Sequence, residues 1–140
     1  MARIDAFLKL GLAQGCSDIH LAVGVPPMLR MHGDLMPIKF RDLGDTELEG
    51  YIAEILTANQ RKRFDEGHDL DFSYVSEDKG RFRVNVFRKE TGIGATFRFI
   101  PGEVPTLESL DLPAVVRKLC DHHQGMILLV GSTGTGKSAT

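Results

Sequence analysis

The sequence predicts an α/β protein in two parts, an antiparallel sheet with flanking helices followed by the beginning of a parallel α/β unit. Segments that alternate in polarity, at residues 69–75, 81–88 and 92–100, predict an antiparallel sheet with one buried face. The unbroken apolar segment 126–130 precedes a glycine-rich loop, as is typical of a buried parallel strand. Between the two patterns lies the proline-containing segment 101–113, which has no periodicity and indicates a linker.

These changes of pattern set the expected domain boundaries. We expect an N-terminal domain over residues 1–100, a linker over residues 101–112 and the start of a second domain over residues 113–140. A helix over residues 114–123 would open that second domain, and segment 126–130 would be its first strand. Such a strand needs parallel neighbours for its backbone hydrogen bonds, so we expect the chain to be the N-terminal part of a longer protein.

The first half of the N-terminal domain is predicted to contain one helix, two strands and two further helices. Apolar residues recur at helical spacing from Ile4 to Leu12, and Gly15 provides a stop signal. Asp45 or Thr46 is the expected N-cap of the second helix. The two strands are expected at residues 17–23 and 28–33. The two further helices are expected at residues 47–57 and 58–67, and these helices would cover one side of the sheet.

Composition and charge are those of an ordinary globular protein. Hydrophobic residues make up 42% of the chain and charged residues 26%, with a formal net charge of −2, so no general electrostatic attraction to nucleic acid or to an anionic membrane is expected. The apolar segment 126–130 is far too short to cross a bilayer, and the N-terminus lacks the pattern of a signal peptide. We therefore expect a cytoplasmic protein without direct membrane insertion, in which Cys16 and Cys120 are free thiols.

The sequence GSTGTGKSAT at residues 131–140 fits the phosphate-binding loop pattern, with two glycines bracketing four residues ahead of Lys137 and Ser138. The glycines let consecutive backbone N–H groups point at an anion, and a following helix would add its positive end. Lys137 would reach the β- and γ-phosphates, and the Ser138 hydroxyl would ligate Mg²⁺. We expect ATP with Mg²⁺ to be bound by Gly131, Ser132, Thr133, Gly134, Thr135, Gly136, Lys137, Ser138 and Ala139.

Binding of a nucleotide is not hydrolysis. The alternative to a binding loop is a glycine-rich surface turn that matches the pattern by accident, and the apolar strand expected immediately before the loop argues against it. Phosphoryl transfer also needs an acidic residue on a neighbouring strand to hold Mg²⁺ and a residue that orients the attacking water. Those strands would follow residue 140, so we expect these 140 residues to bind ATP without turning it over.

Segments 81–88 and 92–100 are predicted to form a hairpin with a loop at residues 89–92. In that register the indices of facing residues sum to 181, which gives one apolar face and places Arg83 directly opposite Arg98 on the other. Like charges in facing positions are unfavourable unless an anion bridges them, and a phosphate is the expected anion. The alternative is that Asp69 and Asp71 on a third strand neutralise both arginines as ordinary surface pairs.

Several motifs in one order resemble the secretion ATPase superfamily, and most closely the PilT-type ATPases that retract type IV pili. The motifs are SDIHL, GVPPMLR, RFRVNVF, GATFRFIP and GMILLVGSTGTGKS, which together span the chain. The resemblance implies a PAS-like N-terminal domain followed by a truncated RecA-like ATPase domain that ends just after its phosphate-binding loop. It also implies that Arg83 and Arg98 act with Lys137 as catalytic residues, by closing onto the phosphates of the nucleotide.

The resemblance further implies a homo-hexameric motor at the cytoplasmic face of the inner membrane, where ATP hydrolysis would drive twitching motility through an inner-membrane pilus platform protein. Two alternatives stay open. One is a pilus assembly or type II secretion ATPase of the same superfamily, although a start of SDIHL at residue 17 favours the retraction type. The other is a non-catalytic module for oligomerisation or regulation in which the loop is vestigial.

The histidines are expected to be structural. In the sequence CDHH, residues 120–123, adjacent helical positions point about 100° apart and cannot converge on one metal ion. His20 alternates with the apolar residues of its strand, so its side chain should face away from the core. A hydrogen bond within the domain or a place in an interface is its expected role.

Overall fold

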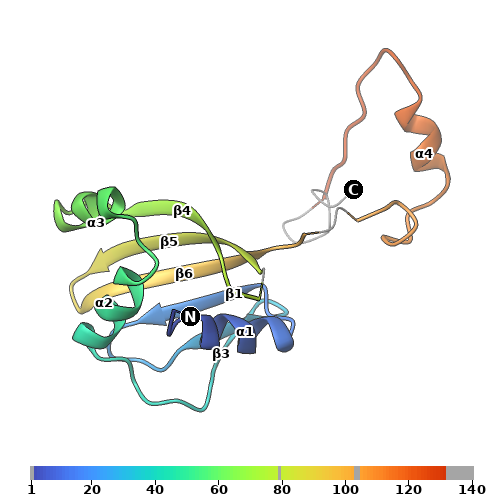
Figure 1. Ribbon diagram of the computed structural model, residues 1–140. Helices are drawn as coiled ribbons and strands as arrows, with labels where there is room; N and C mark the ends of the chain where they lie inside the picture. The colour runs from blue at the N-terminus through green and yellow to red at the C-terminus, as the bar shows by residue number, and fades with distance from the viewer. Residues whose placement is uncertain (1, 79, 103–104, 132–140) are drawn as a thin grey trace. The chain divides into compact units, whose positions relative to one another are not determined.

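The computed structural model describes residues 2–78, 80–102 and 105–131 of the chain. Two units are distinguished, Met1–Gly102 and Glu103–Thr140. The first unit contains a six-stranded sheet and three helices (Figure 1). Its elements, in chain order, are α1 (Asp5–Ala13), β1 (Asp18–Ala22), β2 (Met28–Met31), β3 (Asp34–Pro37), α2 (Asp45–Ala53), α3 (Ala58–Asp65), β4 (Leu70–Val75), β5 (Arg81–Lys89) and β6 (Gly92–Ile100).

The sheet has the strand order β3-β2-β1-β6-β5-β4, and every neighbouring pair is antiparallel. Local hairpins build its two halves, while the pairing of β1 with β6 joins segments that lie far apart in the sequence (Figure 1). The predicted mixed α/β fold with an antiparallel sheet and flanking helices is therefore confirmed.

The predicted register of the β5–β6 hairpin is confirmed at every position. Arg83 pairs with Arg98, and on the other face Val84 pairs with Phe97. The predicted four-residue loop is shorter in the structure, because the ladder continues to the pair formed by Lys89 and Gly92 and leaves a two-residue turn. Gly92 has a φ of 122°, a conformation that side chains with a Cβ rarely adopt.

One face of the sheet carries the hydrophobic core. Side chains alternate along each strand, so that Val84 and Phe97 are fully buried while their neighbours Arg83 and Arg98 are exposed. Helix α1 packs beside β1, α2 beside β6 and α3 beside β4. The opposite face of the sheet, which carries the polar residues of β1, β4, β5 and β6, is left largely open within this unit.

Both ends of helix α2 differ from the prediction. Gly44, in an extended conformation, is the N-cap of α2, so the predicted cap at Asp45 or Thr46 is wrong. Asp45 is instead the first helical residue, where its carboxylate still favours the positive end of the helix. Helix α2 ends at Ala53 rather than at residue 57, because Thr57 forms a capping box with Gln60 at the start of α3.

Strand β3 is an element that the sequence analysis does not predict. A tight turn at His32 and Gly33, both with positive φ (50° and 98°), reverses the chain so that β3 pairs with β2. All four residues of β3 are exposed. An exposed edge strand has no buried face and therefore shows no alternation of polarity in the sequence.

The second unit departs further from the prediction. Helix α4 spans only Val115–Cys120 rather than residues 114–123. Residues 126–130, predicted as a buried parallel strand, form no strand and are exposed, with Val130 at 90% of its full accessibility. A parallel strand needs a neighbour for its hydrogen bonds, and no strand is present among the described residues of this unit.

The two cysteines are free thiols, as predicted, with Cys16 buried and Cys120 exposed. Burial, together with the nearby charge of Asp18, raises the pKa of the Cys16 thiol above its ordinary value, which keeps it protonated and unreactive. Across the described ranges, none of the helices combines the length and the apolar character that a bilayer span requires.

Stability should depend on the buried face of β1. Leu21 is 1% exposed on β1 and Leu35 is 46% exposed on β3. We expect Leu21→Ala to lower the free energy of unfolding by about 2–5 kcal/mol through lost burial and the remaining cavity. Leu35→Ala, as a matched control on the edge strand, should cost less than about 1 kcal/mol. Urea unfolding followed by circular dichroism measures both, and equal losses would contradict the assignment of the core.

Candidate functional site

Arg83 and Arg98 lie side by side on the open face of the sheet, as the hairpin register predicts. Their Cα atoms are direct partners in the β5–β6 ladder, and their side chains are 67% and 69% exposed. Asp71, Asn85 and Thr96 complete the lining of a hollow of about 160 Å³ between these side chains. The hollow therefore combines two guanidinium groups with an amide, a hydroxyl and a carboxylate.

Arg83 forms an exposed ion pair with Asp71 on β4. Its Nε donates to Oδ1 at 3.2 Å and its Nη2 donates to Oδ2 at 3.4 Å. This hydrogen bond raises the pKa of the Arg83 guanidinium above its ordinary value. The alternative considered from the sequence, in which Asp71 neutralises an arginine, is thus correct for Arg83.

Arg98 forms a different kind of pair, with Asp18 on β1. Its Nε donates to Asp18 Oδ1 at 2.8 Å, and the Asp18 side chain is only 6% exposed. The Ser17 hydroxyl donates to the other carboxylate oxygen at 2.9 Å, and Arg30 Nε lies 3.6 Å from the same atom. Burial alone would raise the pKa of the Asp18 carboxyl, but the hydrogen bonds from Arg98 and Ser17 outweigh it and hold that pKa below its ordinary value.

The partner of Arg98 is therefore Asp18 and not Asp69, which was expected from the sequence to share this role with Asp71. Asp18 could have been suspected, because the alternation in SDIHL places it on the polar face with His20. Its contact with Arg98 nevertheless depends on the pairing of β1 with β6, over a separation of 80 residues. No local pattern specifies that pairing.

The ion pairs leave donors available for an anion. No hydrogen bond from either terminal nitrogen of Arg98 to another described residue is present, and Arg83 uses Nε and Nη2 only. The Asn85 amide donates to the Leu70 carbonyl at 3.3 Å, and the Thr96 hydroxyl lies 3.3 Å from His20 Nδ1. A donor set of this kind matches the oxygens of a phosphate group.

The His20 ring contacts the Thr96 hydroxyl and lies close to several charged side chains. Its Nε2 atom is buried without a hydrogen-bond partner among the described residues. Burial, followed by the charge of Arg30, lowers the pKa of the His20 imidazole, although Asp18 opposes the shift. The ring is therefore held neutral at physiological pH.

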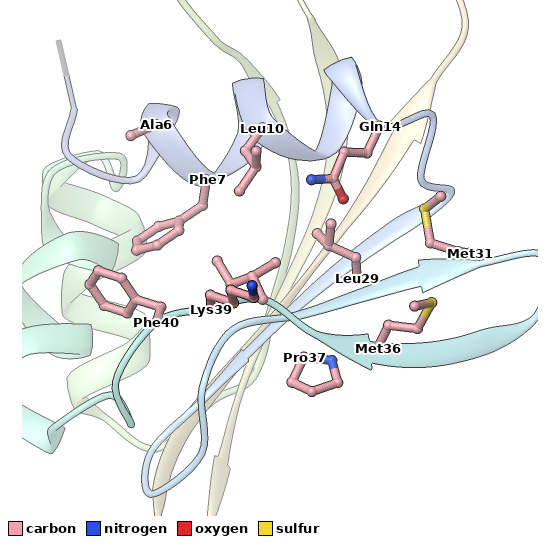
Figure 2. A pocket seen from close by; sticks show the side chains of 11 residues that line it. Ala6, Phe7, Leu10, Gln14, Leu29, Met31, Met36, Pro37, Lys39 and Phe40 are labelled. Atoms are coloured by element: carbon pink, nitrogen blue, oxygen red, sulfur yellow. The ribbon is translucent and has the colours of Figure 1, made fainter.

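A larger hollow of about 590 Å³ lies elsewhere, between α1 and the segment from β2 to residue 40 (Figure 2). Its lining is mainly apolar, and the rings of Phe7 and Phe40 meet edge to face at 5.2 Å. Lys39 is the charged side chain in this lining. The hollow thus lacks a donor set for phosphate, and we place the candidate site at the smaller hollow between the arginines.

Most of the predicted phosphate-binding loop lies outside the described residues. Gly131 is described and exposed, whereas Ser132–Ala139, including Lys137 and Ser138, are not described. In the described part of the chain, no group of three or more histidine, cysteine, aspartate or glutamate residues could hold a metal ion. The arrangement of the loop around ATP and Mg²⁺ stays a prediction.

Comparison with known proteins finds relatives along nearly the whole chain, although no family model matches it. The chain is 40% identical to the type IV pilus retraction ATPase PilT of Pseudomonas aeruginosa over 98% of its own length. It is 34% identical to the type IV pilus ATPase PilU of the same organism over 97% of its length, and 37% identical to a twitching motility protein of Neisseria gonorrhoeae over 81%. The chain is homologous to the PilT-type ATPases of the secretion ATPase superfamily.

Solved structures of this superfamily agree. A crystal structure of the pilus retraction motor PilT with bound ADP matches 99% of the chain with a TM-score of 0.78 and 34% identity. The ATPase DotB of Legionella pneumophila matches 97% with a TM-score of 0.83 and 30% identity. The resemblance inferred from the motifs is confirmed. The chain spans 40% or less of the length of the curated PilT-type relatives named above.

The stability of the first unit should fall in mild acid because of His20. A folded pKa below the ordinary value of 6.5 means that the folded state binds the proton less well than the unfolded chain does. The contribution of His20 to the free energy of unfolding is therefore fully present above its unfolded pKa and is lost as the pH falls through its folded pKa. We expect a lower melting temperature at about pH 5 than at about pH 7.5, and a smaller difference in His20→Gln.

His68, which is exposed, provides the matched control for this titration. His68→Gln should keep the pH dependence of the unmodified chain in the same thermal scans. A pH dependence that survives His20→Gln unchanged would assign the effect to other groups.

Proposed function

We propose that this chain is the nucleotide-binding N-terminal part of a motor ATPase that retracts type IV pili. The observation that carries the proposal is the pair of exposed guanidinium groups of Arg83 and Arg98, aligned across β5 and β6 beside a hollow of about 160 Å³. The homology to pilus ATPases supports it, as does the bound ADP in the PilT structure.

The phosphate-binding loop would provide the other half of the site. Its residues Gly131–Ala139 would wrap the phosphates with backbone N–H groups, Lys137 would reach the β- and γ-phosphates, and Ser138 would hold Mg²⁺. Arg83 and Arg98 would close onto the same phosphates and stabilise the charge that develops during phosphoryl transfer. Residues from the remainder of the protein would supply the catalytic acids, so the 140 residues alone would bind ATP without turnover.

The assembly and the location are part of the proposal. A ring of six subunits would couple cycles of ATP binding and hydrolysis to movement. The ring would work at the cytoplasmic face of the inner membrane against a pilus platform protein. No nucleic acid is expected as a partner, since the formal net charge is −2.

A pilus assembly or type II secretion ATPase of the same superfamily is the second candidate, since the chain also matches an ATPase other than PilT, DotB, with a TM-score of 0.83. The two candidates share the ATPase chemistry and differ in the partner that is moved. Expression of the complete protein in a strain that lacks its pilus retraction ATPase separates them. Restored twitching motility supports the retraction function, and motility that stays absent although the complete protein is produced contradicts it.

Removal of either arginine should reduce ATP hydrolysis by the complete protein. We expect Arg83→Ala and Arg98→Ala to lower kcat at least about tenfold, because each deletes a charged donor to the transition state. Arg81→Ala is the matched control, since Arg81 is exposed on the same strand but does not line the hollow. Near-normal rates in both Arg83→Ala and Arg98→Ala would refute the proposed role.

Loss of Lys137 should test the loop independently. We expect Lys137→Ala to weaken the binding of MgATP to the complete protein at least about tenfold, because the ammonium that pairs with the phosphates is removed. Isothermal titration calorimetry measures the dissociation constant. Unchanged affinity would favour a non-catalytic module with a vestigial loop.

A further inference from the structure

We propose that the two carboxylates beside the arginine pair have opposite roles, in that Asp18 positions Arg98 for a phosphate ligand and Asp71 competes with the ligand for Arg83. The inference rests on the proposed phosphate-binding role of Arg83 and Arg98. It assigns functions to two residues that are equivalent in charge but differ in burial and geometry.

The two ion pairs differ in how easily they can be broken. The Asp18 side chain is 6% exposed, whereas that of Asp71 is 53% exposed. Removing Arg98 from Asp18 would leave a buried carboxylate with one fewer charged partner, which is strongly unfavourable. Separating Arg83 from Asp71 exposes both groups to water, and exposed pairs of this kind contribute little.

The geometry of the Asp18 pair leaves Arg98 able to bind. Its Nε makes the 2.8 Å hydrogen bond to Asp18, so the guanidinium is fixed by one edge and its terminal nitrogens stay available. A planar guanidinium held in this way presents a defined set of donors to a phosphate. Asp18 is itself fixed by the Ser17 hydroxyl and lies between Arg30 and Arg98 in the ladder.

The geometry of the Asp71 pair has the opposite consequence. Asp71 occupies both Nε and Nη2 of Arg83, at 3.2 and 3.4 Å, and it lines the hollow. A phosphate that enters the hollow meets this carboxylate, so Arg83 must exchange Asp71 for the ligand. Asp71 thereby reduces the affinity for any anion that binds too weakly to displace it.

Simple charge counting gives a different expectation. Asp18→Asn and Asp71→Asn each remove one negative charge next to an arginine, so electrostatics alone predicts tighter anion binding in both variants. The positioning role predicts tighter binding only for Asp71→Asn and weaker binding for Asp18→Asn. The sign of the change therefore separates the two accounts.

The test is a titration of the 140-residue chain with inorganic triphosphate, followed by NMR of the arginine Nε–H signals. We expect Asp71→Asn to lower the dissociation constant about threefold or more, and Asp18→Asn to raise it by a similar factor. The Arg98 Nε–H signal should shift in Asp18→Asn before any ligand is added. Tighter binding in both variants, or no change in either, would overturn the proposal.

Asp18 is buried, so folding needs its own control. A second pair of variants, Arg98→Lys and Arg83→Lys, lies at exposed positions and keeps the positive charge. A single ammonium cannot serve Asp18 and a phosphate together, so Arg98→Lys should weaken binding about tenfold, while Arg83→Lys should weaken it less than about threefold. Equal losses in the two lysine variants would also overturn the proposal.

The double variant Arg83→Ala, Arg98→Ala separates the two levels of inference. Because the double variant lacks both arginine signals, its triphosphate binding is measured by isothermal titration calorimetry. Binding that is absent from the unmodified chain, or unchanged in the double variant, would count against the proposed phosphate role itself. Binding that is lost in the double variant but tightened by Asp18→Asn would refute only the positioning role of Asp18.

Discussion

The pairing of β1 with β6 is the interaction on which the rest of the first unit depends. It joins a sheet half built from β1, β2 and β3 to a half built from β4, β5 and β6. On the buried face it sets Ile19 against Phe97 and continues the core across the join. On the open face the same register brings Asp18 to Arg98. A slip by one residue would exchange the two faces of β1, which would expose apolar side chains and remove the buried carboxylate from the arginine pair.

This constraint explains how the fold tolerates two arginines in facing positions. Arg83 and Arg98 repel each other across the β5–β6 ladder, and each meets an aspartate from its other neighbouring strand, Asp71 on β4 and Asp18 on β1. In the order β1, β6, β5, β4, the two positive charges therefore lie side by side and are flanked on each side by one negative charge. Each arginine therefore has a carboxylate partner without a bound anion, and the ion pairs do not by themselves exclude one, because both guanidinium groups stay largely exposed.

Sequence patterns predicted those features whose causes are local. The β5–β6 register follows from alternation and a short turn, so the position of Arg83 opposite Arg98 was available from the sequence. The role of Asp18 was not, because it needs a contact between strands 80 residues apart in the chain. Strand β3 has no buried face and gave no signal. For residues 126–130, in contrast, the sequence predicted a strand that the structure does not contain. Their composition is that of a buried strand, but the described residues supply no neighbouring strand to pair with it.

The two sequence-based readings of the arginine pair, surface neutralisation and phosphate binding, are therefore compatible. Arg83, Arg98 and Arg30 carry one more charge than Asp18 and Asp71, so this group of five residues keeps a small positive excess with its ion pairs in place. A phosphate does not need to find unpaired arginines there. It needs a guanidinium whose free edge is already oriented, and Arg98 has this property because Asp18 holds its Nε. It also needs a guanidinium that can be released from its carboxylate at low cost, and Arg83 has this property because its pair with Asp71 is exposed. The proposed site would bind by exchange of one carboxylate for another anion, and its affinity would depend on the burial of each aspartate as much as on the number of positive charges.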